Sequence, residues 1–396
     1  MAELYKLENE IKHYAWGSPD MIPHLLGKPN PQKESWAELW MGIHQGGPSK
    51  TLVQDKTVLL SELTDLPFLF KFLAAENPLS IQAHPNLAQA REGFDRENKE
   101  GIPLSAAERN YRDPNHKPEI ICALRAFTAM AGFRETAETD ELLSMVNGTE
   151  NLRSALKEGY RPFLTALFGL SDTEKKSLHD SVLASVNQTE KLPLFRLCEK
   201  LAQSYPCDPG ILSPLYLNVI NLKPFEALYI PSGILHAYIQ GFAMECMANS
   251  DNVLRGGLTP KHIDITELIS ILHFEPYIPK VLKPVSMSSP GCYNYIPPES
   301  CKEFSLYLMQ NPVSPNDPVL PGGIELDIPG MGIIAVFSGT AEISVKQGNK
   351  KTENPEQKPI ILNRGESVFI SRRKDRESIH FAGDFTAFAA LVPDGE

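Results

Sequence analysis

The chain reads Ser80-Ile81-Gln82-Ala83-His84-Pro85 in a segment that predicts both a β-strand and a binding site. Apolar and polar residues alternate through it, and the proline ends the run, as in a short strand. Side chains on a strand alternate between its faces, so Ser80, Gln82 and His84 are expected to point the same way. A glutamine and a histidine on one face can offer an oxygen and a nitrogen to a metal ion.

Two other segments supply matching groups. Lys117-Pro118-Glu119 places a lysine and a glutamate two residues apart, and the segment from Pro231 to Tyr238 contains a second histidine. Taken singly, each histidine is more often an ordinary polar residue than a ligand. In combination, three strands would supply the four ligands that a divalent metal needs. These are Gln82, His84, Glu119 and His236.

The composition is that of an ordinary globular protein, with 42% apolar and 22% charged residues. No run of 18 apolar residues is present to span a membrane, and the N-terminus lacks the features of a signal peptide, so we expect the cytoplasm. The six cysteines show no CxxC spacing and are expected to be reduced core residues. A net charge of -11 argues against a nucleic-acid partner, and an anionic substrate would need a local basic patch.

The 396 residues are too many for one core, and their patterns divide into β, helical and β parts. Short, proline-interrupted strand patterns fill roughly the first 135 residues. A helical block follows, marked by the capping box Ser171-Asp172-Thr173-Glu174 and by apolar residues at helical spacing. Strand patterns return near residue 215. Thr259-Pro260 then predicts the start of a helix that runs to about Leu272, and strands follow after residue 276.

Several motifs resemble those of the type I phosphomannose isomerase family and occur in that family's order, from the N-terminus to about residue 265. The pattern Pro231-x-Gly233-x-x-His236 also resembles the second motif of the cupin superfamily, a small β-barrel that holds a metal ion in its interior. The motifs are Tyr14 to Gly17, Ala37 to Gly42 with His44, Pro78 to Pro85, His116 to Glu119, Gly233 to Tyr238, Met247 to Asn252, Arg255, and Gly257 to Lys261.

The resemblance implies a mainly β fold with a helical insertion, in which two cupin-like (jelly-roll) β-barrels accompany an α-helical domain. The catalytic barrel would comprise residues 1–135 and 206–275, the helical insertion 136–205, and the C-terminal cupin-like domain 276–396. The resemblance also implies one zinc ion per chain, bound by the four ligands named above. The implied reaction interconverts mannose 6-phosphate and fructose 6-phosphate by proton transfer between C1 and C2 through an enediol.

Such a reaction needs a base at the carbon and a proton relay between oxygens. Lys117 shares a strand face with Glu119 and is therefore expected to act in proton transfer. Glu245 and Asp251 are carboxylate candidates for the base or the relay, and the sequence does not decide between them.

Positive groups are also expected near the substrate. Arg255 lies in a glycine-rich loop and could cover the negative charge that develops on the enediol oxygens. Lys261 falls in the first turn of the helix predicted to begin at Thr259, where free N–H groups favour an anion. With Ser80 it would bind the substrate phosphate, a role that the family resemblance also implies.

Two other functions stay open at this point. A cupin metal oxygenase would use a facial triad with open positions for oxygen, which a fourth ligand and acid–base residues suit less well. A non-catalytic sugar-binding cupin would be expected to have lost Lys117, Glu245 or Arg255, and all three are present. The expected partner is a small-molecule sugar phosphate, with no nucleic acid and no membrane, and the chain is expected to be a monomer or a weak oligomer.

Overall fold

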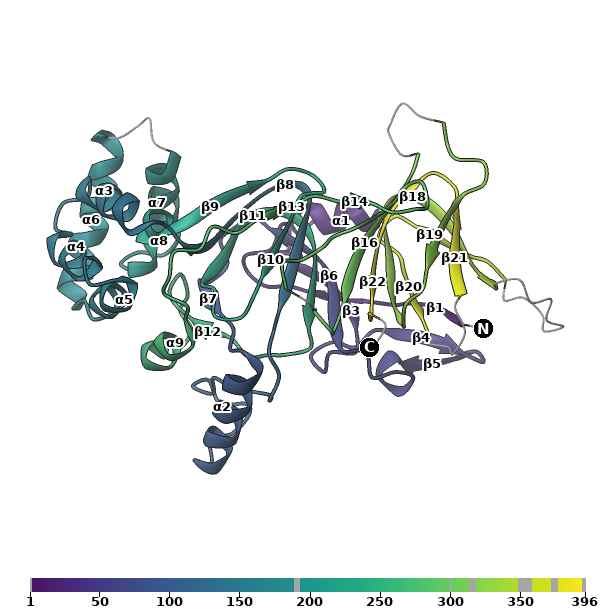
Figure 1. Cartoon of the computed structure of the whole chain (residues 1–396), viewed down its shortest axis with the longest axis horizontal. Helices are drawn as coiled ribbons and strands as arrows, with labels where there is room; N and C mark the ends of the chain where they lie inside the picture. Colours follow the sequence, from purple (N-terminus) through teal and green to yellow (C-terminus); the bar gives the residue numbers. More distant parts are fainter. Residues whose placement is uncertain are drawn as a thin grey trace.

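A computed structural model describes residues 2–188, 193–299, 301–312, 318–347, 358–371 and 377–393. Within these residues the chain forms two large β-sheets and a block of helices at the end of the molecule remote from the second sheet (Figure 1). The predicted fold class, mainly β with a helical insertion, is confirmed. Across the described residues, no helix combines the length and apolar character that a bilayer span requires.

The first sheet has ten strands in the described part of the chain. Seven lie in the order β13 (Val281–Leu282), β10 (Ala227–Ile230), β8 (Glu119–Phe133), β11 (His236–Ala248), β6 (Phe68–Ala75), β3 (Glu38–Gly42) and β2 (Glu10–Lys12). The long strand β8 pairs with β10 at its start and with β9 (Leu217–Leu222) at its end. Two short strands, β7 (Gln82–Ala83) and β12 (Leu254–Arg255), pair beside the start of β11.

The second sheet also has ten strands in the described residues. Seven lie in the order β1 (Leu4–Lys6), β20 (Ser367–Ile370), β18 (Gly332–Gln347), β22 (Phe385–Leu391), β16 (Ser305–Asn311), β15 (Cys292–Asn294) and β14 (Val285–Ser286). Like β8, the long strand β18 changes partners along its length, from β20 to β19 (Ile360–Asn363) and β21 (Glu377–Ala382). Strand β21 also pairs with β17 (Ile324–Asp327). A separate hairpin joins β4 (Lys50–Val53) to β5 (Lys56–Leu59).

One apolar core joins the two sheets. Phe70 and Phe72 of β6 are fully buried in it, because alternate residues of a strand face the same side. Phe369 of β20 and Phe388 of β22 enter the same cluster from the second sheet. Burial of aromatic side chains contributes about 1.5–3 kcal/mol each, so this shared core holds the two sheets together.

The helical block contains α3 (Thr136–Ser144), α4 (Glu150–Leu156), α5 (Tyr160–Phe168), α6 (Asp172–Gln188), α7 (Pro193–Ser204) and α8 (Ser213–Tyr216). The predicted capping box is confirmed, since the Ser171 N–H donates to Glu174 Oε2 at 2.7 Å and the Glu174 N–H donates to Ser171 Oγ at 3.4 Å. The core of the block includes Ile81 and Ala83. The helices therefore pack directly behind β7.

Other helices lie outside this block. They are α1 (Met21–Leu26), α2 (Leu87–Lys99), α9 (Ile265–Ile271) and the 3-10 turns at Leu60–Glu62 and Pro209–Leu212.

One local prediction was wrong, and a second was confirmed over only part of its length. The helix predicted to start at Thr259 begins at Ile265, because the Asp264 carboxylate caps it by accepting the Glu267 N–H at 2.9 Å. The Thr259 hydroxyl instead accepts the Lys261 N–H at 3.1 Å within a turn. The strand predicted from residue 80 to 84 is paired only over Gln82–Ala83.

Candidate active site

Two histidines and a glutamate meet where β7, β8 and β11 converge. His84 follows β7, Glu119 opens β8 and His236 opens β11. The His84 Nε2 atom lies 3.3 Å from Glu119 Oε1, and the His236 Nε2 atom lies 3.4 Å from Glu119 Oε2. All three side chains are almost fully buried, and their ligand atoms lie within 4.8 Å of one another.

The orientation of both imidazole rings is set from behind. The Nδ1 atom of His84 donates to the Asn252 carbonyl at 2.7 Å, and that of His236 donates to the Ile234 carbonyl at 2.9 Å. A proton on Nδ1 leaves a lone pair on Nε2. Among the described residues, neither buried Nε2 atom has a hydrogen-bond partner. Because unpaired buried polar atoms are costly, two free lone pairs beside a carboxylate fit a metal cation.

Electrostatics keep His84 and Glu119 in the forms that bind a metal ion. Burial, helped by the nearby charge of Lys117, lowers the pKa of His84 to about 4, so its ring is neutral at pH 7. Burial alone would raise the pKa of Glu119. The charge of Lys117 and the contacts of the two histidines outweigh burial and hold that pKa well below its usual value. An ionised carboxylate and neutral imidazoles are the forms that bind metals.

Gln82 lies between His236 and Arg255 in the sheet. The strand register places it opposite His236 of β11 on one side and Arg255 of β12 on the other. Directly opposed residues project from the same face with Cβ atoms about 4.5–5.5 Å apart. Gln82 is therefore on the face that carries the histidines, as a fourth ligand has to be.

Lys117 contacts the same carboxylate. Its Nζ lies 3.0 Å from Glu119 Oε1, and the residue is only 8% exposed. The predicted common face of Lys117 and Glu119 is thus confirmed. A lysine at this position is within reach of anything bound at the cluster, and it is shielded from bulk water.

A buried row of charges extends from the cluster, and the sequence interpretation missed most of it. Lys71 Nζ lies 3.0 Å from Glu38 Oε1 and 2.8 Å from Glu245 Oε2. The Trp40 indole N–H donates to Glu38 Oε2 at 2.8 Å. A signal was available, because Lys71 is the one charged residue in the apolar strand Phe68–Ala75. A buried charge needs a partner, so that lysine indicated carboxylates nearby.

Tyr238 connects Glu245 to the cluster. Its hydroxyl donates to Glu119 Oε2 at 3.1 Å and also interacts with Glu245. Burial, opposed by Lys71 but reinforced by the charge of Glu119, raises the pKa of Glu245. A carboxylate with a raised pKa is suited to proton transfer near neutrality.

Asp251 is held differently. Its Oδ1 lies 3.3 Å from His44 Nε2, and its N–H donates to Asp113 Oδ2 at 2.7 Å. The hydrogen bond of His44, only partly offset by burial, lowers the pKa of Asp251. Asp251 is therefore a weaker base than Glu245 and is half-exposed.

Three cations gather beside Gln82. Partial burial of its ammonium group comes first among the causes that lower the pKa of Lys261, followed by the charges of Arg255 and Arg112. Burial and Arg112 also lower the pKa of Arg255. Over the described residues no carboxylate forms an ion pair with any of these three side chains. Arg112 was not singled out from the sequence, where no spacing links it to the other two.

Ser80 lies at the edge of this group. The next residue, Ile81, accepts the Gly256 N–H at 2.8 Å and donates to the Gly257 carbonyl at 3.0 Å. These bonds hold the backbone of Ser80 against the loop that bears Arg255. Lys261 is exposed and lies outside any helix. The prediction that a helix N-terminus helps Lys261 to bind the phosphate is therefore wrong.

His116 forms an ion pair with a residue next to the second sheet. Its Nε2 lies 2.8 Å from Glu303 Oε1. Burial would raise the pKa of Glu303, but the hydrogen bond and charge of His116 lower it to about 2. A carboxyl group whose pKa falls on folding stabilises the fold above its unfolded pKa, about 4.3, and this stabilisation is lost as the pH falls toward 2.

Glu303→Gln is therefore expected to reduce the free energy of unfolding at pH 6 by about 1 kcal/mol, since the pair is partly exposed to solvent. The deficit relative to the unmodified chain should shrink as the pH falls from about 5 to 3. Urea unfolding at several pH values measures it, with Glu158→Gln, at an exposed position, as the control. A deficit that does not change with pH would contradict the ion-pair origin.

The fold and the site together define a metal-dependent enzyme built on cupin-like β-barrels. A buried pair of histidines with one carboxylate supplies the ligands, and lysines and carboxylates surround it. Residues 4–136 match the family model described as the phosphomannose isomerase type I catalytic domain.

Known relatives and structures agree. The chain is 42% identical to the mannose-6-phosphate isomerase of Salmonella typhimurium over 69% of this chain and 75% of the relative. It is 30% identical to a probable mannose-6-phosphate isomerase of Caenorhabditis elegans over 98% of this chain and 96% of the relative. A zinc-bound crystal structure of mannose 6-phosphate isomerase superposes with a TM-score of 0.83 at 34% identity, covering 98% of this chain and 99% of that one.

A further crystal structure is the Salmonella typhimurium enzyme bound to fructose 6-phosphate and zinc. It has the same TM-score of 0.83, 34% identity and the same coverage. The chain belongs to the type I phosphomannose isomerase family.

Proposed function

We infer that this protein is a zinc-dependent aldose–ketose isomerase that interconverts mannose 6-phosphate and fructose 6-phosphate. The observation that carries the inference is the pair of unpartnered, buried Nε2 atoms of His84 and His236 facing Glu119, with Lys117 in contact with the same carboxylate. Family membership identifies the substrate. In this proposal residues 1–135 and 206–275 form the catalytic barrel, 136–205 the helical insertion and 276–396 the C-terminal domain. Two short strands cross these bounds, because β1 pairs in the second sheet and β13 in the first.

We assign one zinc ion per chain to Gln82, His84, Glu119 and His236. The fit rests on lone pairs held toward one point by backbone carbonyls behind the rings, and on a single ionised carboxylate. When bound, the ion supplies a Lewis acid that polarises sugar oxygens near C1 and C2. With one carboxylate and three neutral ligands the site keeps a net positive charge, which favours an enediolate.

Proton transfer falls to the ionisable groups around the cluster. Lys117 moves a proton between the sugar oxygens, since its ammonium lies next to Glu119 and away from bulk water. Glu245 is the better candidate for the base at carbon because its pKa is raised, whereas that of Asp251 is lowered. Asp251 then serves to hold His44 at the edge of the site.

The substrate phosphate is assigned to Lys261 and Ser80, with Arg112 as a further cation. The support is a group of positive side chains without carboxylate partners in the described structure of a chain whose net charge is -11. Arg255 lies next to Gln82 in the strand register and so nearer to the reacting oxygens. The guanidinium group can donate two hydrogen bonds to the charge that develops there.

Substitutions of Lys261 and Arg255 are expected to change different kinetic constants. Lys261→Ala should raise KM for mannose 6-phosphate about 10-fold or more with a smaller effect on kcat, because it removes binding common to ground and transition states. Arg255→Ala should lower kcat about 100-fold, because the charge it meets develops in the transition state. Steady-state kinetics measure both, with exposed Lys157→Ala as the control. The reverse pattern would exchange their roles.

Purified protein tests the function against its rivals. Two histidines and one carboxylate also suit an iron oxygenase, so metal analysis accompanies a coupled assay of mannose 6-phosphate conversion and an oxygen electrode. We expect zinc, formation of fructose 6-phosphate and no oxygen uptake. Oxygen uptake with iron would favour the oxygenase, and sugar binding without turnover would favour a non-catalytic cupin.

A further inference from the structure

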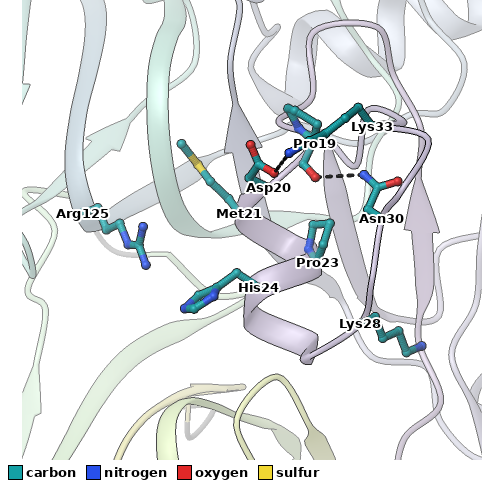
Figure 2. A pocket seen from close by; sticks show the side chains of 9 residues that line it. All are labelled: Pro19, Asp20, Met21, Pro23, His24, Lys28, Asn30, Lys33 and Arg125. Atoms are coloured by element: carbon teal, nitrogen blue, oxygen red, sulfur yellow. Dashed lines mark hydrogen bonds and ion pairs between the residues drawn. The ribbon is translucent and has the colours of Figure 1, made fainter.

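Two adjoining cavities lie at the seam between helix α1 and the two sheets, away from the metal cluster. One has a volume of about 420 Å³ and the other about 130 Å³. Both are lined by Met21, His24 and Arg125, so they share a wall, and Figure 2 shows the residues around the larger one. The smaller cavity is completed by Arg364 and Phe337 from the second sheet's part of the chain. The site therefore exists only where the two sheets meet.

The seam is positively charged in an acidic protein. Its carboxylate, Asp20, is already paired with Lys33, as Figure 2 shows. The Arg364 Nε donates to the Leu25 carbonyl at 3.0 Å, and its Nη1 lies 3.5 Å from His24 Nε2. These contacts hold the Arg364 guanidinium beside the cavity but leave its charge unneutralised. No carboxylate in the described residues pairs with Arg125 or Arg364.

A β-bulge places Arg125 at the seam. The register of β8 with β11 pairs Ala123 with Ala243 and Phe127 with Gly241, so residues 124–126 lie opposite a single residue, Phe242. Extra residues in one strand redirect side chains out of the regular pattern, and such bulges often occur at binding sites. Arg125 is exposed, although it belongs to a strand that is otherwise mostly buried.

The floor of the smaller cavity is apolar. Phe242 and Phe337 contribute rings whose centroids lie 6.2 Å apart, one from each sheet. Met21 and Leu25 of α1 complete the floor. A ligand that fits has to combine an anionic group for the two arginines with a compact apolar part for the rings.

We propose that this seam binds a small organic phosphate monoester, with the phosphate between Arg125 and Arg364 and the organic part against Phe242 and Phe337. Two guanidinium groups and a histidine suit a dianion better than a carboxylate monoanion, because a phosphate offers three acceptor oxygens to the forked donors. The second sheet thereby acquires a binding role, since it supplies Arg364 and half of the apolar floor.

Calorimetric titration with phenyl phosphate, which carries a dianion and one ring, tests the proposal. The full chain should bind it at the seam, and Arg125→Ala and Arg364→Ala should each weaken that binding at least 10-fold. Lys261→Ala alters only the side chains assigned to the substrate phosphate at the active site, so it should leave binding at the seam intact. Arg161→Ala removes an arginine that stacks on Phe274, far from the seam, and is the matched control. Thermal unfolding of each variant excludes misfolding as the cause.

Two further probes define the ligand class. Inorganic phosphate lacks the ring and benzoate lacks the dianion, so both should bind at least 10-fold more weakly than phenyl phosphate. If inorganic phosphate bound as tightly as phenyl phosphate, the proposed contact of the organic part with Phe242 and Phe337 would be disproved. If benzoate bound as tightly or more tightly, the assignment of a phosphate ligand would be overturned. If phenyl phosphate bound as well to both arginine variants as to the unmodified chain, the seam site itself would be disproved.

Discussion

His84→Ala is expected to lose bound zinc and isomerase turnover together. The substitution removes one of two buried Nε2 lone pairs that face Glu119 and leaves a site with too few ligands. A Lewis acid contributes several kcal/mol to stabilising the transition state, so kcat/KM should fall roughly 1,000-fold or more. Metal content by mass spectrometry and the coupled mannose 6-phosphate assay measure the two losses on the same preparation.

The matched control is His179→Ala, because His179 lies on α6 in the helical block, remote from the cluster. This variant should retain both metal and turnover. Unmodified protein stripped with a chelator should lose activity and recover it when zinc is restored, whereas His84→Ala should not recover. Full turnover by a metal-free variant would show that the cluster is not the catalytic centre.

Lys117→Met is expected to retain zinc and fold normally but to lose most of kcat. Methionine fills a similar volume, so packing around the 8% exposed side chain is preserved while the proton carrier is removed. Positioned acid–base groups contribute about 100- to 10,000-fold, which sets the expected fall in kcat. Steady-state kinetics over a range of pH, with metal analysis and thermal unfolding, separate this effect from damage to the site.

A second substitution separates charge from proton transfer. Lys117→Arg keeps a positive group next to Glu119 but cannot release a proton near neutrality. If proton transfer is the role, Lys117→Arg should be nearly as inactive as Lys117→Met. If arginine restored turnover, Lys117 would serve only to hold Glu119 ionised. An unchanged kcat and pH profile in Lys117→Met would move the acid–base role to Glu245 and Asp251.

Local sequence patterns correctly predicted those contacts that form between residues close together in the chain. The capping box at Ser171 formed because its hydrogen bonds span only three residues, and tertiary packing does not alter them. Lys117 and Glu119 contact each other because residues two apart in an extended segment share a face. Family motifs then indicated which distant histidine belongs with Glu119, a pairing that spacing alone cannot predict.

Local patterns failed where two signals competed. Thr259-Pro260 has the form of a helix start, but Asp264 also caps well, and the chain uses the later site. As a result, the predicted phosphate-binding site does not include a helix N-terminus. The structure adds Arg112, which lies more than 140 positions before Arg255 and is coupled to it only through folding.

Motifs and local periodicity were enough to identify the residues able to bind a metal, the order of β and helical segments, and, through the family motifs, the reaction class. Which charged groups meet depends on the folded chain. Lys71, Glu38 and Glu245 belong to three strands, and their ion pairs depend on the register of β3 and β11 with β6. The seam between Arg125 and Arg364 likewise requires both sheets. Register and sheet packing are set by burial of apolar faces across the whole chain, so no short segment of sequence contains them.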